Sequence, residues 1–245
     1  MNCRISMFDL ATVIITRAQP GADETDKRLR SIGLRTALSP MLELARTETP
    51  LPPLEDVSGL LFTSANGVRF FAQASDRRDI SAWCVGPATF RAATEAGFVD
   101  CYNAEGDGQA LADFVVARLD PADGALLHVA NAAAAGDVAR RLETAGFEVV
   151  FAPLYEAQPV ISLSSEVIDV LKREVAAIIL VHSAKGAAAF AAAAKHLELG
   201  RHSAVAVSVK AARPLSTLGL KAVEISSEPN EDGLFRAIND VCSTL

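Results

Sequence analysis

Ser39-Pro40-Met41-Leu42-Glu43 returns further along the chain as Ala152-Pro153-Leu154-Tyr155-Glu156, with proline and glutamate in the same places. A glycine-containing segment precedes each copy at the same spacing, Ile32-Gly33-Leu34 before the first and Ala145-Gly146-Phe147 before the second. Glycine just past a helix can take the left-handed conformation that closes the last turn, and the apolar residue after it folds back onto the helix. The paired segments therefore predict a duplicated architecture in which a helix ends and a strand begins at each glycine.

A second pairing supports the duplication. Ala96-Gly97-Phe98 and Leu218-Gly219-Leu220 are two further glycine helix ends, and the segment 62–67 (Phe-Thr-Ser-Ala-Asn-Gly) is echoed by 181–186 (Val-His-Ser-Ala-Lys-Gly). The alternative is that α/β proteins use such helix ends repeatedly without any duplication, but this does not explain the paired Pro-x-x-Glu segments. We interpret the chain as two similar α/β lobes.

Short apolar runs bounded by turn residues alternate with segments of helical periodicity. Such runs are typical of parallel strands buried on both faces, and the alternation predicts parallel sheets flanked by helices. The expected strands are 13–15, 59–62, 82–85, 126–129, 178–181 and 204–207. Two of the expected apolar helix faces consist of Ala22, Thr25, Leu29 and Ile32, and of Val138, Leu142 and Ala145.

The two proline-centred segments mark the expected crossings between the lobes. If the chain leaves the first lobe near Pro40 and returns near Pro153, its two ends share one lobe and its middle forms the other. We therefore expect a discontinuous first domain of residues 1–39 and 160–245, a second domain of residues 45–151, and connectors at 40–44 and 152–159.

Composition indicates an ordinary soluble globular protein. Half of the 245 residues are hydrophobic, which is enough for two modest cores. A formal charge of −7 argues against general nucleic-acid binding, and no segment has the length of a membrane span. Asp9 interrupts the apolar N-terminal stretch, which argues against a signal peptide. The four cysteines (Cys3, Cys84, Cys101 and Cys242) have no Cys-x-x-Cys spacing, so we expect reduced thiols and a cytoplasmic location.

The expected turns between strands and helices are the places to look for chemistry, because helix amino termini there present backbone N–H donors. All six carry small or hydroxyl residues, which let those donors approach an anion. Each turn taken alone could be a simple helix cap, since Ser, Thr and Asn are preferred cap residues. The turns are 16–18, 63–67, 86–89, 130–132, 182–186 and 208–211.

Several familiar motifs are missing. The sequence has no dinucleotide-binding Gly-x-Gly-x-x-Gly after a strand, no phosphate-binding loop, no His-Glu-x-x-His and no Gly-x-Ser-x-Gly. Its four histidines show no metal-binding spacing. These absences argue against a nucleotide, a metal ion or a nucleophilic serine, and we expect no cofactor.

Tyr155 interrupts the repeat, because the first copy has Leu42 at the same place. A hydroxyl group therefore stands where packing accepts an aliphatic side chain, which makes Tyr155 a candidate for chemistry. The alternative is an aromatic side chain that only packs at the crossing, with its hydroxyl in water.

At these residues the chain resembles the uroporphyrinogen-III synthase family of tetrapyrrole biosynthesis. The resemblance covers essentially the whole length, and its most specific part is the combination of Thr-Ser-x-Asn-Gly-Val at 63–68 with Val-Gly-x-x-Thr at 85–89. Further matching segments are 13–17, 145–149, 153–155 and 231–234.

The resemblance implies two α/β lobes joined by a two-stranded connector, with the active site in the cleft between them. It also implies the reaction: hydroxymethylbilane, a linear tetrapyrrole, loses its terminal hydroxyl as water, inverts ring D through a spiro intermediate and closes the macrocycle. No metal or organic cofactor is implied. A non-catalytic ligand-binding or regulatory homologue with the same two lobes is the alternative, because fold alone does not fix function.

The resemblance further implies roles for individual residues. Tyr155 would donate a proton or hydrogen bond to the leaving hydroxyl. The partners implied are the small-molecule substrate and, transiently, the preceding pathway enzyme, and a monomer is expected. The acetate and propionate groups of the substrate would be bound at Arg17, Thr63, Ser64, Asn66, Gly86, Ala88, Thr89, Ser183 and Lys210.

This chain departs from the family pattern in its second half. His182 stands in place of the expected Thr, Ser208-Val209-Lys210-Ala211 replaces a Gly-x-x-Thr turn, and an alanine run follows Asn131 where Arg-Gly is customary. These departures leave open whether His182, Lys210 and Asn131 contact the substrate.

Overall fold

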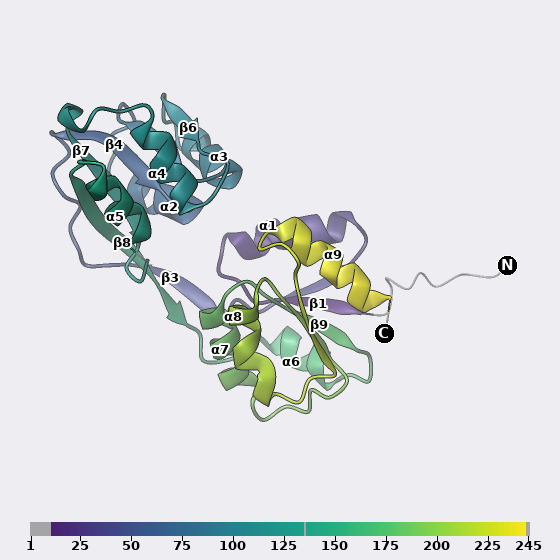
Figure 1. Cartoon of the computed structure of the whole chain (residues 1–245). Coiled ribbons are helices and arrows are strands. Elements are labelled where there is room, and N and C mark those ends of the chain that lie inside the picture. Colours follow the sequence, from purple (N-terminus) through teal and green to yellow (C-terminus); the bar gives the residue numbers. More distant parts are fainter. Residues whose placement is uncertain (1–10, 135, 244–245) are drawn as a thin grey trace. The chain divides into compact units, whose positions relative to one another are not determined.

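The computed structural model describes residues 11–134 and 136–243 and divides the chain into two compact units (Figure 1). Unit 1 contains the described residues up to Leu44 together with those from Gln158 onward, and unit 2 contains Ala45–Ala157. A mostly parallel sheet flanked by helices forms the centre of each unit. The predicted fold class of two α/β lobes is thereby confirmed.

Unit 1 is built on a five-stranded sheet in the order β11-β10-β9-β1-β2, and every neighbouring pair is parallel. Its strands are β1 (Thr12–Ile15), β2 (Arg35–Leu38), β9 (Ala177–Val181), β10 (Ser203–Ala206) and β11 (Ala222–Ile225). Its helices are α1 (Gly21–Ser31), α6 (Ser165–Lys172), α7 (Ala184–Ala194), α8 (Val209–Ala212) and α9 (Glu231–Cys242), with a 3₁₀ helix at Arg213–Thr217.

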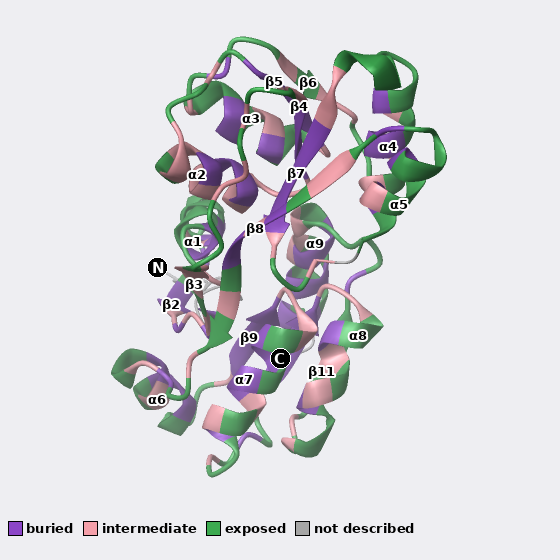
Figure 2. Cartoon of the chain, turned by 90° about the vertical axis from the view of Figure 1, so that its left-hand side faces the viewer, coloured by how far each residue is buried: buried purple, intermediate pink, exposed green. Residues whose placement is uncertain are grey.

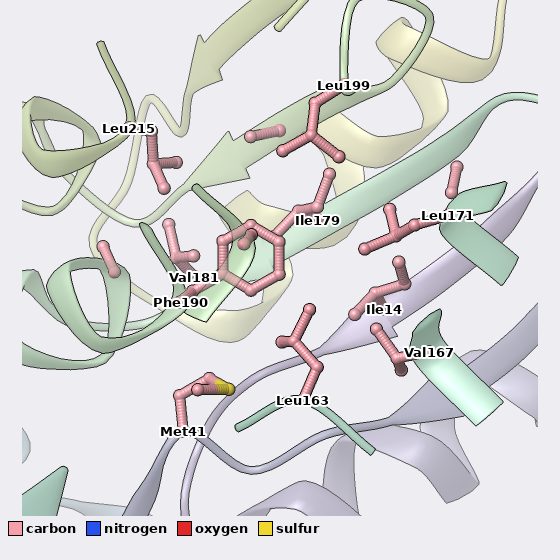
Figure 3. Close-up of a cluster of buried hydrophobic side chains, with 14 of the residues drawn as sticks. Ile14, Met41, Leu163, Val167, Leu171, Ile179, Val181, Phe190, Leu199 and Leu215 are labelled. Carbon is pink, nitrogen blue, oxygen red and sulfur yellow. The ribbon is translucent and has the colours of Figure 1, made fainter. Parts of the chain in front are cut away.

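Two apolar clusters cover the two faces of this sheet. Helices α1 and α9 pack on one face through residues such as Leu29 and Ile238. Helices α6, α7 and α8 pack on the other, where Phe190 projects among Ile179, Val181 and its neighbours (Figure 3). Burial of apolar area on both faces explains why the run from 177 to 181 is hydrophobic at every position.

Unit 2 is built on a six-stranded sheet in the order β3-β8-β7-β4-β5-β6. Helices α2 and α3 pack on one face of it and α4 and α5 on the other. Its strands are β3 (Leu42–Arg46), β4 (Val57–Phe62), β5 (Ser81–Cys84), β6 (Cys101–Asn103), β7 (Ala125–Asn131) and β8 (Val149–Pro159). Its helices are α2 (Ala65–Ala74), α3 (Pro87–Glu95), α4 (Gly108–Val116) and α5 (Asp137–Thr144), with a 3₁₀ helix at Pro121–Asp123.

The two units have the same arrangement of strands and helices, but the order of these elements along the chain starts at a different strand in each unit. In unit 2 the elements from β4 to β8 follow one another without interruption. In unit 1 the equivalent order is β9-α7-β10-α8-β11-α9, and the last part of the repeat, β1-α1-β2, comes from the beginning of the chain. Unit 1 is therefore a circularly permuted copy of unit 2. In both units the central strands are buried while the outer helix faces are exposed (Figure 2).

Strands β3 and β8 carry the chain from one unit to the other. They are neighbours in the sheet and run antiparallel, as the hydrogen bonds from Val160 N to Met41 O (3.0 Å) and from Thr47 N to Leu154 O (3.1 Å) show. The boundary between the units falls inside both strands. The two proline-centred segments of the sequence thus form one paired ribbon.

The four glycine helix ends have the expected left-handed backbone, with φ of +88° at Gly33, +90° at Gly97, +94° at Gly146 and +62° at Gly219. After the first three, the next residue donates its N–H to a carbonyl five residues earlier, as Leu34 does to Leu29 (3.1 Å). This is the Schellman arrangement. A strand follows each glycine, as predicted, although the fourth glycine follows a 3₁₀ helix rather than an α-helix.

All six strands expected from the apolar runs are present. Each of the two expected helix faces, however, includes one residue beyond the end of the observed helix. Ile32 is 49% exposed and Ala145 is exposed as well. Both residues are the C-caps of their helices, α1 and α5. They lie beyond the last regular turn, where the apolar stripe that faces the sheet no longer continues.

The helices in the described ranges are all too short or too polar to cross a membrane. Cys84 and Cys242 are buried free thiols and Cys101 is a half-buried one, whereas Cys3 lies outside the described residues.

We expect Gly97→Ala to lower the free energy of unfolding by about 1–2 kcal/mol, because an L-residue is strained at φ +90°. A Cβ atom there would meet nothing within 4 Å, so the cost comes from the backbone alone. The change can be measured by chemical denaturation of the whole protein, with the fluorescence of Trp83 reporting the unfolding of unit 2.

Gly136→Ala is the matched control for this substitution. Its Cβ atom would also meet nothing within 4 Å, but the backbone φ of Gly136 is −78°. Equal losses of stability in the two variants would contradict the role assigned to the left-handed backbone.

Candidate functional site

Each sheet contains one pair of neighbouring strands from which the chain passes, over opposite faces, to strands on opposite outer sides of the pair. In unit 1 these strands are β9, which leads to α7, and β1, which leads to α1; in unit 2 they are β4, which leads to α2, and β7, which leads to α5. Ligands of wound parallel sheets bind at the carboxyl ends of such strand pairs. We call the carboxyl end of each pair the switch point of its unit.

Tyr155 lies at the switch point of unit 2. It belongs to β8, where it pairs with Asn131 at the end of β7, and its hydroxyl is 2.8 Å from Ser64 Oγ in the turn after β4. Ser64 is the N-cap of α2, and its Oγ accepts a hydrogen bond from Gly67 N (3.2 Å). The ring of Phe70, one turn further along α2, stacks on the Tyr155 ring with centroids 4.8 Å apart and planes 7° apart. Both the ring and the hydroxyl of Tyr155 are therefore fixed.

The environment of Tyr155 differs from that of an aromatic side chain with its hydroxyl in water. Only 5% of the residue is exposed, and its hydroxyl faces Ser64. Burial raises the pKa of Tyr155, and the hydrogen bond with Ser64 offsets only part of that rise. The phenol is thus a proton or hydrogen-bond donor throughout the neutral range.

A buried imidazole stands beside the same turn. His128 on β7 is 1% exposed, and its Nε2 lies 3.5 Å from Thr63 Oγ1. Its Nδ1 has no hydrogen-bond partner among the described residues, and its ring packs edge-on against Phe151 at 5.6 Å. Burial lowers the pKa of His128 to about 4, so the imidazole is neutral at pH 7.

The start of α3 is the second turn of unit 2 with predicted site residues. Gly86 is its N-cap and provides no side chain, and Pro87 has no N–H group. The N–H groups of Ala88 and Thr89 are therefore left without a capping side chain, although the Thr89 side chain itself is buried. Asn66, by contrast, lies on α2 and accepts a hydrogen bond from Arg69 (3.0 Å).

The turn after β7 does not provide the free donors that its sequence suggests. Asn131 Oδ1 accepts the N–H of Ala133 (2.8 Å), and the N–H of Ala132 goes to the carbonyl oxygen of Tyr155 (2.8 Å). These donors are used within the fold, so the prediction that residues 130–132 present donors to an anion is wrong for Ala132.

The switch point of unit 1 holds charged groups instead. Arg17, in the turn after β1, donates from Nη1 to Thr25 Oγ1 (3.2 Å) and to Glu231 Oε1 (3.2 Å). The Thr25 hydroxyl also hydrogen-bonds to Glu231, and Arg28 Nη1 is 3.3 Å from Glu231 Oε2. Burial by itself would raise the pKa of Glu231, but contacts with His182, Thr25 and Arg17 lower it to about 2. Glu231 is therefore ionised at neutral pH.

His182 follows β9, next to this charged group. Its Nε2 is 3.8 Å from Glu231 Oε1, which is too far for a hydrogen bond, and within the described part of the chain neither ring nitrogen has a hydrogen-bond partner. Burial lowers the pKa of His182, and contact with Glu231 opposes this only in part. The imidazole is thus held neutral beside a carboxylate.

The remaining predicted residues of unit 1 lie at helix starts. Ser183 is the N-cap of α7 and accepts a hydrogen bond from Gly186 N (3.1 Å), the same cap that Ser64 forms on α2. Lys210 is exposed on the four-residue helix α8, whose cap is Ser208. Among the predicted site residues, the structure thus places Tyr155 in contact with Ser64, Thr63 in contact with His128, and Arg17 in contact with Glu231. The described contacts of Asn66, Ser183 and Lys210 include none of these pairs.

Sequence reasoning missed four residues of the switch points: Thr25, Phe70, His128 and Glu231. A signal existed for His128, because a histidine inside the apolar run 126–129 indicates a buried imidazole. Thr25, in contrast, was assigned to an apolar helix face, and its hydroxyl partners come from residues far away in the sequence.

Two further observations concern ligands. Within residues 11–134 and 136–243, no three side chains of His, Cys, Asp or Glu gather in a way that could hold a metal ion. A groove of about 800 Å³ between α4 and α5 is lined by Asp107, Asp113, Arg141 and others, but by none of the predicted site residues. Because none of the switch-point residues described above lines it, we do not assign it to the site.

Comparison with known proteins identifies relatives. A family model described as uroporphyrinogen-III synthase HemD matches residues 23–236. A crystal structure of a uroporphyrinogen-III synthetase from Helicobacter pylori is 16% identical, with a TM-score of 0.65 over 95% of this chain and 99% of that one. A mutant uroporphyrinogen III synthase from Thermus thermophilus is also 16% identical, with a TM-score of 0.49 over 96% and 100% of the two chains. A comparison with curated proteins gave no match.

We expect the buried imidazole of His128 to make folding sensitive to acid. Its pKa is about 4 in the folded protein and about 6.5 when unfolded, so the stability it provides is fully present above pH 6.5 and is lost as the pH falls towards 4. Between pH 7 and pH 4, wild type should lose about 3 kcal/mol more stability than His128→Leu, as denaturant titrations at each pH would measure.

The exposed His196 offers the control, because His196→Gln also removes a histidine but changes no buried side chain. If His128→Leu showed the same loss between pH 7 and pH 4 as wild type, His128 would not be neutral in the folded protein.

Proposed function

The chain belongs to the uroporphyrinogen-III synthase family, and we propose that it is an enzyme that cyclises hydroxymethylbilane with inversion of ring D and loss of water. The observation that carries the proposal beyond family membership is the fixed phenol at the switch point of unit 2. Tyr155 is buried, protonated and held by Ser64 and Phe70. These are the properties required of a group that assists a departing hydroxyl.

In the proposed first step, the carbon–oxygen bond of the terminal hydroxymethyl group breaks. The electron pair of that bond leaves with the oxygen, and Tyr155 hydrogen-bonds to this oxygen and transfers its proton to it, so that water departs and a phenolate remains. The proton that the substrate loses when the macrocycle closes restores the phenol. The pyrrole nitrogen of ring D supplies electron density to the carbon, which gives a cationic azafulvene. The high pKa of the buried phenol suits this role, because it keeps the proton available at neutral pH.

The later steps form and rearrange carbon–carbon bonds within the substrate through the spiro intermediate. A pyrrole that ionises readily needs little chemical help, so the enzyme acts mainly by holding ring D in the orientation that leads to inversion. The proposed mechanism uses no metal ion or organic cofactor.

We propose that acetate and propionate groups of the substrate are bound at the predicted residues of both units. The uncapped N–H groups of Ala88 and Thr89 after Gly86 support this, since carboxylates bind at such helix starts. Lys210 is exposed and Arg17 is held in place, which suits both for pairing with carboxylates. Ser64 already contacts Tyr155 and Gly67, so it supports the phenol in addition to any substrate contact.

Further parts of the proposal follow from the function. The enzyme would be a lyase that acts in the cytoplasm as a monomer. Its substrate would reach it through transient contact with the preceding pathway enzyme. A non-catalytic homologue is the competing proposal, and only an activity assay separates the two.

We expect purified protein supplied with freshly prepared hydroxymethylbilane to yield the type III isomer of the cyclic product. Spontaneous closure gives the type I isomer, so separation of the two isomers by chromatography measures the enzyme directly. Exclusive formation of the type I isomer by correctly folded protein would favour the non-catalytic homologue.

We also expect Tyr155→Phe to lower kcat about 100-fold, at the low end for loss of a general acid because the substrate ionises readily. Folding should be preserved, since the ring still stacks on Phe70. Tyr102→Phe is the matched control. Tyr102 is the other tyrosine of the chain; its ring stacks on Trp83 and 38% of the residue is exposed. Removal of its hydroxyl should therefore leave kcat unchanged. Equal kcat values for wild type and Tyr155→Phe would limit Tyr155 to packing.

A further inference from the structure

The structure assigns a positioning role to Glu231 and Gly21: we propose that together they hold the Arg17 guanidinium at the switch point of unit 1 so that it binds one carboxylate of the substrate. This inference rests on the proposed function, because it takes the substrate to be a polycarboxylate. Glu231 and Gly21 act through Arg17 and do not themselves touch the substrate.

One end of the guanidinium is committed to the protein. Nη1 of Arg17 donates to both Glu231 and Thr25, each at 3.2 Å. Thr25 is fully buried on α1, and Glu231 is the first residue of α9, so two helices fix the position of this nitrogen. A flexible side chain is thereby held in one orientation before any ligand binds.

The backbone at the start of α1 provides the space for the guanidinium. A Cβ atom added to Gly21 would lie only 2.5 to 2.7 Å from Nε, Cζ and Nη2 of Arg17. Any residue other than glycine would therefore displace the guanidinium. Gly21 has no positive φ angle, so its backbone does not require glycine. The close approach of Arg17 is the physical reason for glycine at this position.

The free side of Arg17 suits a carboxylate. Neither Nε nor Nη2 donates a hydrogen bond to another residue in the part of the chain that the structure describes, and 31% of the side chain is exposed. Nε and Nη2 form the edge of the guanidinium that can bind both oxygens of a carboxylate. Because Nη1 is already bound, this edge is the one that remains for a ligand.

Glu231 anchors Arg17 rather than competing with the ligand for it. Its Oε2 is engaged by Arg28 and its Oε1 by Thr25 as well as by Arg17, and its side chain is only 22% exposed. The carboxylate is thus fixed from several sides and contacts only Nη1. If Glu231 competed with the ligand for Arg17, its carboxylate would instead contact the Nε and Nη2 edge of the guanidinium.

The test compares Glu231→Gln with Asp232→Asn. Asp232 is the next residue of α9 and pairs with Arg28 at 2.5 Å, but it has no contact with Arg17. Loss of one positioned, charge-assisted contact predicts a KM for hydroxymethylbilane about tenfold higher in Glu231→Gln, with kcat for the type III isomer nearly unchanged. Asp232→Asn should keep the wild-type KM.

Gly21→Ala supplies a second variant in case Glu231→Gln fails to fold. The added methyl displaces the Arg17 guanidinium without adding or removing a charge, so KM should again rise about tenfold. The effect should disappear in the background of Arg17→Gln: the double variant Gly21→Ala/Arg17→Gln should have the KM of Arg17→Gln alone. A residue that only stabilised the fold would add its own effect in that background.

An unchanged or lower KM in Gly21→Ala would overturn the inference, and a lower KM in Glu231→Gln would show that Glu231 competes with the substrate. Either result, obtained with a wild-type protein that makes the type III isomer, leaves the proposed function intact. A wild-type protein that makes only the type I isomer would overturn the proposed function, and this inference with it.

Discussion

One hydrogen bond sets the geometry on which the candidate site depends, the bond from the N–H of Gly67 to Ser64 Oγ. It fixes where α2 begins and therefore where the serine oxygen stands relative to β8. A Cβ atom at Gly67 would lie 2.8 Å from the carbonyl oxygen of Val129 on β7, so the helix can start this close to the sheet only with glycine there. The hydroxyl of Tyr155 is held because the serine is held.

The same bond recurs in unit 1, yet the two switch points have diverged in chemistry. Ser183 accepts from Gly186 as Ser64 accepts from Gly67. Around this shared turn, unit 2 gathers hydroxyl groups, a phenol and a neutral imidazole, whereas unit 1 places a neutral imidazole beside an arginine and a half-buried carboxylate. One backbone framework therefore carries a phenol in one copy and an ion pair in the other.

Much of the fold could be predicted from local patterns, because helix ends and buried strands are determined by nearby residues. The glycine ends and the apolar runs are of this kind, and the exceptions, Ile32 and Ala145, lie one residue past regular helix. The circular permutation and the charged pairs could not be predicted in this way. Thr25 and Glu231 are 206 residues apart in sequence, and no local pattern relates them. The partners of a polar side chain are decided by the topology of the sheet, which places distant turns side by side.

The difference in charge between the switch points follows from how each equivalent helix is capped. In unit 2 the acid next to the start of α4, Asp107, is itself the cap and accepts the N–H of Ala110 (3.0 Å). In unit 1 the neutral Asn230 caps α9 by accepting from Gly233 (2.8 Å), so the acid at the next position, Glu231, is free to reach across to α1. Burying that carboxylate is costly unless cations and hydroxyl groups surround it, and Arg17, Arg28 and Thr25 do so. An arginine at position 17 therefore serves the fold as well as any ligand, and its free edge is the part of the cluster that the fold does not use.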